Sequence, residues 1–344
     1  MAADLPGVLV GHAQDPRRPT GVTVVLLPEG TVGGVDVRGA APGTRETDVL
    51  DPVNTIEAVH AVVLAGGSAF GLDAASGVMR WLEERGRGVP AGPARVPIVP
   101  AAVIFDLGIG DHTIRPDAEM GYRACDAAVP IAGAAPGNVG AGAGATIGKL
   151  RGPDRMMRGG VGIADVRAGG ITMAAVVVVN AVGDVVDPSD GRVLAGARAA
   201  ARSLELARPI DLLLAKGSPA AAPGTNTTVG ALITDARLSK AQVTRLAQVA
   251  HDGLARTIRP VHTPMDGDTL FVVATGTAAL APATASPAPQ GSGAAAPSPA
   301  LPPDMTLLSI LAAEVTAMAV LNAIRSAEGL LIGDLWLPAW RDRA

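Results

Sequence analysis

The sequence predicts an α/β fold, and three features of its 344 residues support that prediction. Short runs rich in β-branched residues, at positions 21–27, 60–65 and 171–180, each end at Gly, Pro or Asn, as buried strands do. Helix-length stretches with apolar residues spaced three and four apart lie between such runs. No unit recurs with a period of about 20 to 50 residues, which excludes solenoids and other repeat folds. We therefore expect an α/β sandwich.

Composition excludes several classes of protein. Hydrophobic residues make up 48% of the chain, which excludes a disordered protein. The formal net charge of −4 comes from 28 basic and 32 acidic residues without a basic stripe, so we expect no nucleic-acid partner. No uninterrupted apolar run reaches about 18 residues, so we expect no membrane partner. Cys125 is a lone cysteine, which excludes an internal disulfide.

The N-terminal residues, MAADLPGVLVGHAQDPRRPTG, differ from a signal peptide. They contain an acid and a proline where a signal peptide needs a basic segment followed by a long apolar one. We interpret them as the start of the mature protein and expect a cytoplasmic location.

Three helices are predicted from apolar spacing and end signals. The first covers residues 68–84, with Ser68 as its cap after a tight turn and Gly86 as its stop. The second covers residues 239–258, because Ser239 and Gln242 form a capping box and Pro260 ends the helix. The third covers residues 305–327 and is amphipathic or buried.

One segment interrupts this pattern. Residues 276–303 are almost wholly Ala, Pro, Ser, Thr and Gly, which predicts a flexible Pro/Ala-rich surface insertion. The residues after it, 304–344, are too few to fold alone. We therefore expect one domain over residues 1–344.

Several segments suggest known motifs, but their spacing fails. In GAGAGATIGKL, residues 140–150, Ala143 and Leu150 stand where a phosphate-binding loop needs Gly and Ser or Thr, and the G-x-G-x-x-G spacing of dinucleotide-binding loops is also missing. A nucleotide-dependent enzyme is therefore disfavoured. In GGSAFG, residues 66–71, Phe70 replaces the last Gly of a nucleophile elbow. The five histidines lack metal-ligand spacing, so we expect no metal.

Polar residues gather just before an apolar run at residues 224–235, GTNTTVGALITD. One interpretation is a Thr-rich turn whose hydroxyls cap backbone amides. The other is a threonine nucleophile, which its own α-amine activates once the chain is cut before it. Such an amine has an unperturbed pKa of about 7.7 to 8.0. Residue types alone leave both interpretations open.

Asp266 and Asp268 flank a glycine in TPMDGDTLF, residues 263–271, at the start of a predicted strand. Residues two apart in a strand point to the same face, so we expect the two carboxylates side by side. Such a pair accepts hydrogen bonds from a nucleophile, or binds a hard cation if further oxygen ligands are near, which the local sequence lacks. A solvated Asp-Gly-Asp turn is the other interpretation.

Several blocks, in the same order, resemble the P1 peptidase family (family S58), which includes D-aminopeptidase/esterase and β-aminopeptidase enzymes and nylon-oligomer hydrolases. The blocks are GVLVGHA (7–13), LAGGSAFGLDAASGV (64–78), VPIVPAAVIFDL (96–107), GAGATIGKL (142–150), NTTVG (226–230) and AHDGLARTIRPVHTPMDGDTLF (250–271). The resemblance implies a four-layer αββα sandwich similar to N-terminal-nucleophile hydrolases, in a precursor that cleaves itself. The implied products are an α subunit, residues 1–226, and a β subunit, residues 227–344.

The resemblance also implies roles for single residues. Thr227 is the implied nucleophile and Asn226–Thr227 the implied scissile bond, cut by an N-to-O acyl shift followed by hydrolysis. Lys149 is placed beside the nucleophile, where its charge lowers the pKa of the amine or hydroxyl. Asn180 is placed where its side-chain amide stabilises an oxyanion.

Further residues complete the implied site. Asp266 and Asp268 are expected to orient the threonine, and Phe105 and Ser68 are candidate substrate-binding residues. Serine-type aminopeptidases of the family carry Ser as nucleophile. Thr in the NTT context together with Asp-Gly-Asp looks more like the nylon-oligomer hydrolase branch.

The resemblance therefore predicts an autoproteolytic amidohydrolase of linear amides, similar to endohydrolases of 6-aminohexanoate (nylon) oligomers and without a cofactor. The alternative activity is that of an aminopeptidase acting on D-amino acid amides and esters or on β-peptides. The non-enzymatic alternative is a member of the fold that binds a small molecule and keeps Thr227 internal. Expected partners are a small amide, peptide or oligoamide substrate and further copies of the chain, since family members assemble as tetramers of cleaved αβ pairs.

Overall fold

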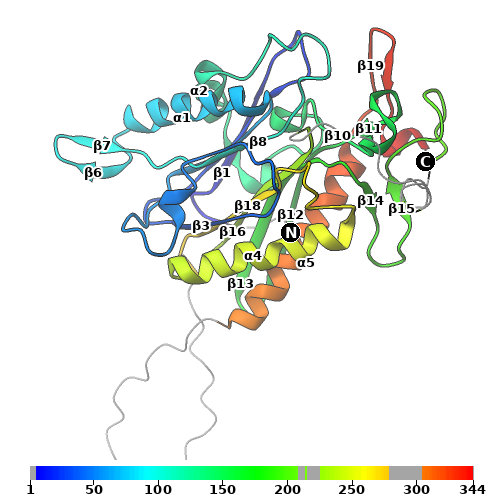
Figure 1. The fold of residues 1–344 in the computed structure, drawn as a ribbon. Coiled ribbons are helices and arrows are strands. Elements are labelled where there is room, and N and C mark those ends of the chain that lie inside the picture. Colours follow the sequence, from blue (N-terminus) through cyan, green and yellow to red (C-terminus); the bar gives the residue numbers. More distant parts are fainter. Residues whose placement is uncertain (1–4, 208–213, 215–224, 279–303, 344) are drawn as a thin grey trace, which may run out of the picture.

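Two β-sheets lie face to face, and helices cover the outer face of each (Figure 1). The computed structural model describes residues 5–207, 214, 225–278 and 304–343. The four layers, in the order helix, sheet, sheet, helix, agree with the predicted αββα sandwich.

The first sheet has six strands in the order β4-β8-β5-β2-β1-β9. Their bounds are β1 (Leu9–Gln14), β2 (Gly21–Leu26), β4 (Thr44–Arg45), β5 (Ala61–Ala65), β8 (Ala101–Val103) and β9 (Val129–Pro130). Helices α1 (Ala74–Glu83) and α2 (Ala118–Asp126) pack on this sheet, and the predicted strands at 21–27 and 60–65 are both part of it.

The second sheet has five strands in the order β12-β13-β16-β18-β3. Their bounds are β3 (Val32–Val37), β12 (Gly160–Ala168), β13 (Ile171–Asn180), β16 (Thr227–Thr234) and β18 (Thr269–Ala274). All neighbouring pairs are antiparallel except β16 and β18, which run parallel. Helices α4 (Lys240–Thr257) and α5 (Met305–Ser326) cover its outer face.

Strand β13 shows why these sequences form a central sheet. Every residue of β13 is buried, as a strand covered on both faces requires. Val177 and Val179 pack in the core that includes α4 and α5, whereas Val176 and Val178 pack in the core between the two sheets. The period of two along a strand therefore divides one apolar run between two hydrophobic cores.

Smaller elements surround the two sheets. They are the hairpins β6 (Val89–Ala91) with β7 (Ala94–Val96), β10 (Thr146–Ile147) with β11 (Met157–Arg158) and β19 (Leu330–Ile332) with β20 (Leu335–Leu337), and the sheet of β14 (Asp184–Val186), β15 (Val193–Ala195) and β17 (Ile258–Arg259). The β10–β11 hairpin matters for the site, because the residues that follow β10 lead directly to Lys149.

The helix predictions have mixed outcomes. The capping box of α4 is confirmed, with Ser239 and Gln242 bonded reciprocally, and α5 matches its predicted range within one residue. The helix at 68–84 is partly wrong, because Ser68–Asp73 is a 3₁₀ helix and α1 begins only at Ala74. Ser68 does not cap either helix, since its φ is +54° and no side-chain cap hydrogen bond is present. The tight turn after β5 thus forces a 3₁₀ entry before regular helix can form.

Helix α5 is long and apolar enough to cross a membrane, by length and composition alone. An 18-residue window of this helix has a mean hydropathy of 1.9. However, 61% of that window is buried inside the protein, where the helix packs on β12, β13 and α4. Such burial is what the core helix of a folded domain shows. The predicted insertion at 276–303 falls mostly outside the described residues, which resume at Asp304.

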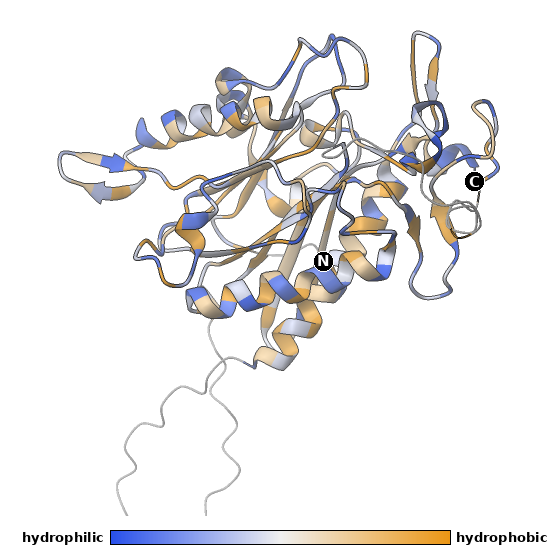
Figure 2. Cartoon of the chain, viewed as in Figure 1, coloured by the Kyte–Doolittle hydropathy of each residue, from blue (hydrophilic) through white to orange (hydrophobic). Residues whose placement is uncertain are grey.

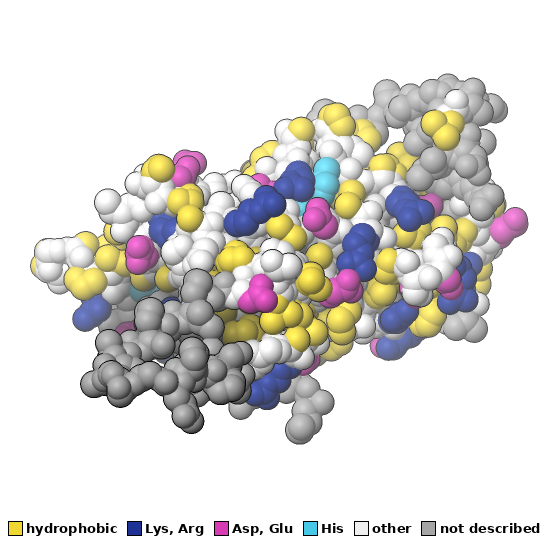
Figure 3. All heavy atoms as spheres, turned by 90° about the horizontal axis from the view of Figure 1, so that it is seen from below, with side chains coloured by type: hydrophobic (Ala, Val, Ile, Leu, Met, Phe, Trp, Pro, Cys, Tyr) yellow, Lys and Arg dark blue, Asp and Glu magenta, His cyan; other side chains and the backbone are white. Residues whose placement is uncertain are grey.

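The surface agrees with the balanced composition. Helix α4 carries hydrophobic and hydrophilic residues along its whole length (Figure 2), and its buried residues are spaced three and four apart, as on one face of an amphipathic helix. On the face shown in Figure 3, positive and negative side chains are interspersed among hydrophobic ones. The described part of that face therefore carries no extended patch of one sign.

Candidate active site

Strand ends of the five-stranded sheet meet at one edge. Strand β13 ends at Asn180, β16 begins at Thr227, and these two residues are paired across the antiparallel register. Strand β18 begins at Thr269, directly after the Asp-Gly-Asp segment, and Val37 at the end of β3 lies opposite Thr269. The sheet topology thus brings the sequence-predicted residues together at this edge: Lys149, Asn180, Asn226, Thr227, Asp266 and Asp268.

Thr227 is buried, with 3% of its surface exposed. Its hydroxyl donates a hydrogen bond to the carbonyl oxygen of Asn226. The backbone N–H of Gly267 donates to the same oxygen at 2.9 Å. A Cβ at position 267 would lie 2.7 Å from the backbone oxygen of Ala41 and 3.1 Å from the Oγ1 of Thr227, so glycine permits this close approach. Two donors therefore converge on the carbonyl of the Asn226–Thr227 peptide bond.

Lys149 reaches the same peptide from a different segment. Gly148 adopts a left-handed conformation, with φ +69°, and turns the chain into the 3₁₀ turn that starts at Lys149. The Nζ of Lys149 donates to the backbone oxygen of Asn180 at 2.9 Å, to Asn180 Oδ1 at 2.9 Å and to the backbone oxygen of Thr225 at 3.0 Å. Three acceptors match the three N–H donors of an ammonium group.

Opposing effects act on the pKa of Lys149. Burial lowers the pKa of Lys149 to about 7, while the carboxylates of Asp266 and Asp106 act in the opposite direction. An ordinary lysine stays fully charged near neutral pH, whereas Lys149 can gain or lose its proton near pH 7.

Asn180 is fully buried and uses both ends of its side-chain amide. Its Oδ1 accepts from Lys149 and from the backbone N–H of Thr146 at 3.1 Å, and its Nδ2 donates to the backbone oxygen of Phe105 at 3.2 Å. The Nδ2 group carries two hydrogens, and the bond to Phe105 uses one of them, so the predicted role of Asn180 as an oxyanion donor stays a prediction. In this structure, Asn180 orients Lys149 by accepting a hydrogen bond from its Nζ.

Asp268 is 1% exposed, and both of its oxygens have partners. Oδ1 accepts the backbone N–H of Thr228 at 2.6 Å, and Oδ2 accepts the backbone N–H of His262 at 3.1 Å and its Nδ1 at 2.8 Å. Nδ1 must therefore carry the ring proton. Asp268 thus orients Thr227 through the amide of the next residue.

Asp266 is held by a local turn. Its Oδ2 accepts the backbone N–H of Thr263 at 2.8 Å and the hydroxyl of Thr263 at 2.5 Å. Burial, and then the neighbouring charge of Asp268, raise the pKa of Asp266. The alternative of a solvated turn is wrong, because Asp266 and Asp268 are each 1% exposed. They also precede β18, so the same-face argument for a strand does not apply to them.

Sequence reasoning missed three residues of this site: His262, Thr263 and Gly267. The histidines were considered only as metal ligands, whereas His262 binds a carboxylate. Its φ of +56° lets its backbone N–H and its ring reach the same oxygen of Asp268. The available signal was the position of all three residues within the run HTPMDGD.

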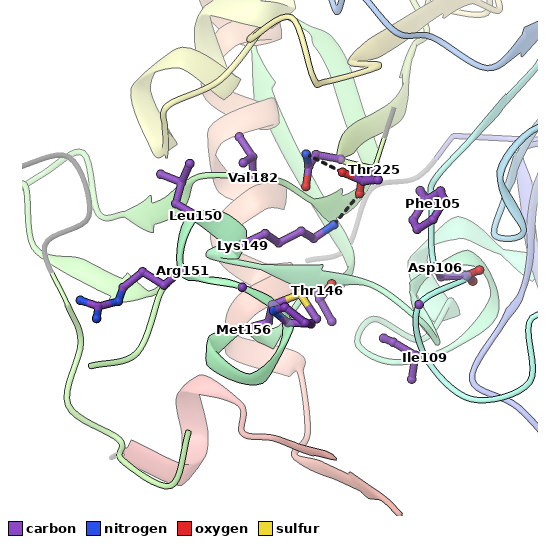
Figure 4. A pocket seen from close by; sticks show the side chains of 14 residues that line it. Phe105, Asp106, Ile109, Thr146, Lys149, Leu150, Arg151, Met156, Val182 and Thr225 are labelled. Atoms are coloured by element: carbon purple, nitrogen blue, oxygen red, sulfur yellow. Dashed lines mark hydrogen bonds between the residues drawn. The ribbon is translucent and has the colours of Figure 1, made fainter. Parts of the chain in front are cut away.

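A cavity of about 570 Å³ opens beside Lys149 (Figure 4). It is lined by Phe105, Asp106, Gly108, Ile109, Thr146, Lys149, Leu150, Arg151, Gly152, Pro153, Met156, Val182, Thr225 and Asn226. The ammonium of Lys149 points toward Thr225, and Phe105 lies on the far side of Thr225 (Figure 4). Phe105 is thus placed as a pocket residue, whereas Ser68 is not part of this lining.

The carboxylate of Asp106 is already neutralised by a partner. It forms an ion pair with Arg18 at 2.7 Å, and neither side chain is exposed. It also accepts from the hydroxyl of Thr20 at 2.7 Å and from the backbone N–H of Gly67 at 2.9 Å. Asp106 therefore stabilises the wall of the cavity through these contacts.

Within the described ranges, no group of three or more His, Cys, Asp or Glu side chains is arranged to hold a metal ion. The functional groups found at this edge are a hydroxyl, the amine of Lys149, two carboxylates and backbone N–H donors.

Comparison with known proteins places this arrangement in a family. A sequence model of peptidase family S58 matches residues 2–333. The chain belongs to peptidase family S58. This family comprises hydrolases of amide bonds, as the resemblance predicted.

Two relatives differ in the activity their names give. An uncharacterized aminopeptidase of Mycobacterium tuberculosis (strain ATCC 25618 / H37Rv) is 47% identical to this chain in an alignment 356 positions long, which covers 98% of this chain and 96% of that protein. A 6-aminohexanoate-oligomer endohydrolase of Paenarthrobacter ureafaciens is 37% identical over 275 residues, which cover 79% of this chain and 74% of that protein.

Solved structures support the fold. A β-aminopeptidase of a Burkholderia species aligns with a TM-score of 0.68 at 23% identity and covers 97% of this chain and 89% of that one. An L-aminopeptidase D-Ala-esterase/amidase of Ochrobactrum anthropi, described as a new variant among the Ntn hydrolase fold, has a TM-score of 0.68 at 21% identity and the same coverage. These likenesses show that the chain has the same fold, as the predicted αββα sandwich similar to N-terminal-nucleophile hydrolases requires.

Proposed function

We propose that this S58 protein cleaves itself between Asn226 and Thr227 and then hydrolyses linear amides with Thr227 as its N-terminal nucleophile. The observation that carries the proposal is the convergence of the Thr227 hydroxyl and the Gly267 N–H on the carbonyl of Asn226. A hydroxyl beside the carbonyl of its own peptide bond is suited to an N-to-O acyl shift, and a fixed N–H stabilises the oxyanion.

Self-cleavage would proceed in two steps. The Oγ1 of Thr227 loses its proton and attacks the carbonyl carbon of Asn226. The C–N bond then breaks, and the nitrogen takes up a proton to leave an ester and a free amine. Water hydrolyses the ester, which releases the carboxylate of Asn226 and restores the hydroxyl of Thr227.

In turnover, the α-amine of Thr227 would accept the proton of its own hydroxyl, because the unperturbed pKa of such an amine is about 7.7 to 8.0. The hydroxyl oxygen attacks the substrate amide, the amine product leaves with a proton, and water hydrolyses the acyl-enzyme ester. The ammonium of Lys149 lowers the pKa of the nucleophile's groups, and Asp268 fixes the strand end that carries Thr227.

The proposed substrate class is a linear amide, as in the 6-aminohexanoate-oligomer endohydrolase that is 37% identical. Aminopeptidase activity is the second candidate, favoured by the name of the relative that is 47% identical. We further propose a cytoplasmic location and an assembly of several cleaved αβ pairs, in line with the family resemblance.

Adjacent threonines allow a matched test. Thr227→Val removes the attacking hydroxyl and keeps the shape, whereas Thr228→Val makes the same change at a side chain whose buried hydroxyl has no hydrogen-bond partner among the described residues. The readouts are a denaturing gel, intact mass and the N-terminal sequence of any fragment. We expect wild type and Thr228→Val to give two fragments, the second beginning Thr-Thr-Val-Gly or Thr-Val-Val-Gly.

We expect Thr227→Val to remain a single chain without amidase activity. A Thr227→Val protein that is cleaved at the same bond contradicts the assignment of the nucleophile. A wild-type chain that stays intact and hydrolyses no amide contradicts the proposed function as a whole.

A further inference from the structure

Two histidines from different elements lie next to each other at the edge of the candidate active site. His251 belongs to α4, and His262 follows β17 in the segment that leads to Asp266 and Asp268. Their ring centroids are 4.8 Å apart and their ring planes make an angle of 67°, which is a T-shaped contact. Because the ring of His262 binds Asp268, His251 is one contact further from the proposed nucleophile.

The ring of His251 is held in a fixed orientation. Its side chain is fully buried, and its Nε2 donates to the backbone oxygen of Asp36 in β3 at 3.1 Å. A carbonyl oxygen only accepts, so Nε2 carries the ring proton. Burial lowers the pKa of His251, which keeps this ring neutral near pH 7. The hydrogen bond therefore fixes the imidazole relative to both α4 and β3.

Arg38 ties the same two elements to Asp268. Its Nε donates to Asp36 Oδ2 at 3.0 Å, and its Nη2 donates to the backbone oxygen of Gln248 in α4 at 3.0 Å. The backbone N–H of Arg38 donates to the backbone oxygen of Asp268 at 2.9 Å. Strand β3 and helix α4, which pack against each other, thus form a fixed frame beside Asp268.

His262 depends on its surroundings for its conformation. It lies outside the helices and strands, and its φ of +56° is in the left-handed region, which a residue with a Cβ rarely adopts. Such a conformation persists only where neighbouring groups hold it. Asp268 Oδ2 holds the backbone N–H and the Nδ1 of His262, and the ring of His251 packs against the same imidazole.

We propose that His251 is a positioning residue for the nucleophile. It holds the ring of His262 in the orientation in which Nδ1 binds Asp268 Oδ2. Asp268 then uses Oδ1 to hold the N–H of Thr228, the residue next to Thr227. The inference rests on the proposed function, because it assigns His251 a part in preparing Thr227 for attack.

Two substitutions separate the contacts of His251 from its volume. His251→Leu keeps a similar volume and loses both the planar group and the N–H that Asp36 accepts, whereas His251→Gln keeps a planar group and an N–H near the position of Nε2. In freshly purified precursor, we expect His251→Leu to slow self-cleavage at least about fivefold and His251→Gln to stay within about twofold of wild type. In the cleaved protein, kcat for amide hydrolysis should fall in parallel, with KM within about twofold.

A double variant tests whether His251 acts through His262. If it does, adding His251→Leu to His262→Leu slows cleavage by no more than about a further twofold, because the contact between the rings is already lost. Independent effects would multiply. His60→Leu is the matched control, since His60 is also a buried histidine and accepts the N–H of Ile98 at 3.1 Å. We expect His60→Leu to lower the free energy of unfolding and to cleave within about twofold of wild type.

The ring of His262 can also be followed without cleavage. In the uncleaved Thr227→Val protein with isotope-labelled histidine, NMR reports the Nδ1–H of His262. We expect His251→Leu to shift this signal and to speed the exchange of its proton with water. The control His60→Leu should leave both unchanged.

The outcomes separate this inference from the proposed function. Wild-type cleavage by His251→Leu, equally slow cleavage by His251→Leu and His251→Gln, or multiplied effects in the double variant overturn the inference and leave Thr227 as the nucleophile. If His251→Leu does not fold, His251→Asn replaces it, because its shorter side chain places no N–H at Nε2. A wild-type precursor that is never cleaved refutes the proposed function, and the NMR comparison then decides the role of His251.

Discussion

Lys149 and Lys240 each donate three hydrogen bonds, but of the two only Lys149 lines the cavity beside the candidate active site. Lys149 donates to the backbone oxygens of Asn180 and Thr225 and to Asn180 Oδ1. Lys240, at the start of α4, donates to the backbone oxygens of Val49, Asn54 and Ile56 at 2.8 to 3.0 Å. Burial lowers the pKa of both lysines.

The difference lies in what the acceptors belong to. The acceptors of Lys240 all lie in one short loop, so its hydrogen bonds fasten that loop to α4. The acceptors of Lys149 come from β13 and from the residue before Asn226, and a cavity opens beside them. A buried lysine therefore becomes chemically useful through a neighbouring hydroxyl, carbonyl and cavity, and burial by itself gives no such role.

Exchanging each lysine for methionine is the strongest test of this comparison. We expect Lys149→Met to slow self-cleavage about a thousandfold, because both the charge and the orientation of the Asn180–Thr225 region are lost. We expect Lys240→Met to cleave normally and to lose about 1 to 3 kcal/mol of unfolding free energy, because three carbonyls lose their donor. Intact mass over time and urea unfolding measure the two effects. Equal cleavage rates would break the comparison.

Asp268→Asn is expected to have the next largest effect, a loss of about a hundredfold in turnover and in cleavage rate. The variant keeps an acceptor for the Thr228 N–H, but an amide NH₂ then faces the N–H donors of His262. The change also removes one cause of the raised pKa of Asp266, which should therefore fall. Timed mass spectrometry of freshly purified precursor gives the rate. An unchanged rate removes Asp268 from the site.

His262 sharpens the comparison further, because nothing corresponding to it supports Lys240 among the described contacts. We expect His262→Leu, which loses the ring N–H to Asp268, to slow cleavage about tenfold. His262→Asn places a side-chain N–H near the position of Nδ1 and should restore most of the cleavage rate. If both variants cleave equally fast, His262 serves stability alone and is not a positioning residue.

The last prediction concerns the pH dependence of stability. The pKa of Lys149 is about 7 in the folded chain and about 10.5 when unfolded, so between these values the unfolded chain holds more protons. Unfolding free energy should therefore rise with pH, by up to about 1.4 kcal/mol per pH unit above pH 7, and stay flat below it as far as Lys149 is concerned. In the uncleaved Thr227→Val protein, urea unfolding at pH 7 and pH 9 measures this slope. Adding Lys149→Met should remove the part of the slope that comes from Lys149, and a slope that Lys149→Met leaves unchanged contradicts the assignment.

Part of the fold could be predicted from local patterns. The strand at 171–180 and the capping box at Ser239 follow from short-range rules, and both are confirmed. The helix at 68–84 was partly wrong, because the left-handed turn at Gly67 and Ser68 imposes a 3₁₀ segment that apolar spacing does not reveal.

The candidate site shows the same division. Thr227, Asp266 and Asp268 stood out as polar residues beside strands, and the family resemblance added Lys149 and Asn180. The roles of His262 and Gly267 were not evident from spacing alone, because His262 binds Asp268 within the same turn and the Gly267 N–H binds the carbonyl of a residue far away in the sequence, Asn226. In the sequence, a glycine between two acids indicates only a turn. The structure shows that the N–H of Gly267 also donates to the carbonyl of Asn226.

The sequence by itself determined the α/β class, the family and the residue types available for chemistry, because these depend on periodicity and on motif order along the chain. Only the tertiary structure decided which atoms meet. Asn180 and Thr227 lie 47 positions apart in the sequence, yet the antiparallel register of β13 and β16 makes them partners. The parallel pairing of β16 and β18 then places Asp266 and Gly267 beside Asn226. Strand register is set by the burial of both faces of the sheet, and that burial exists only when the whole chain has folded.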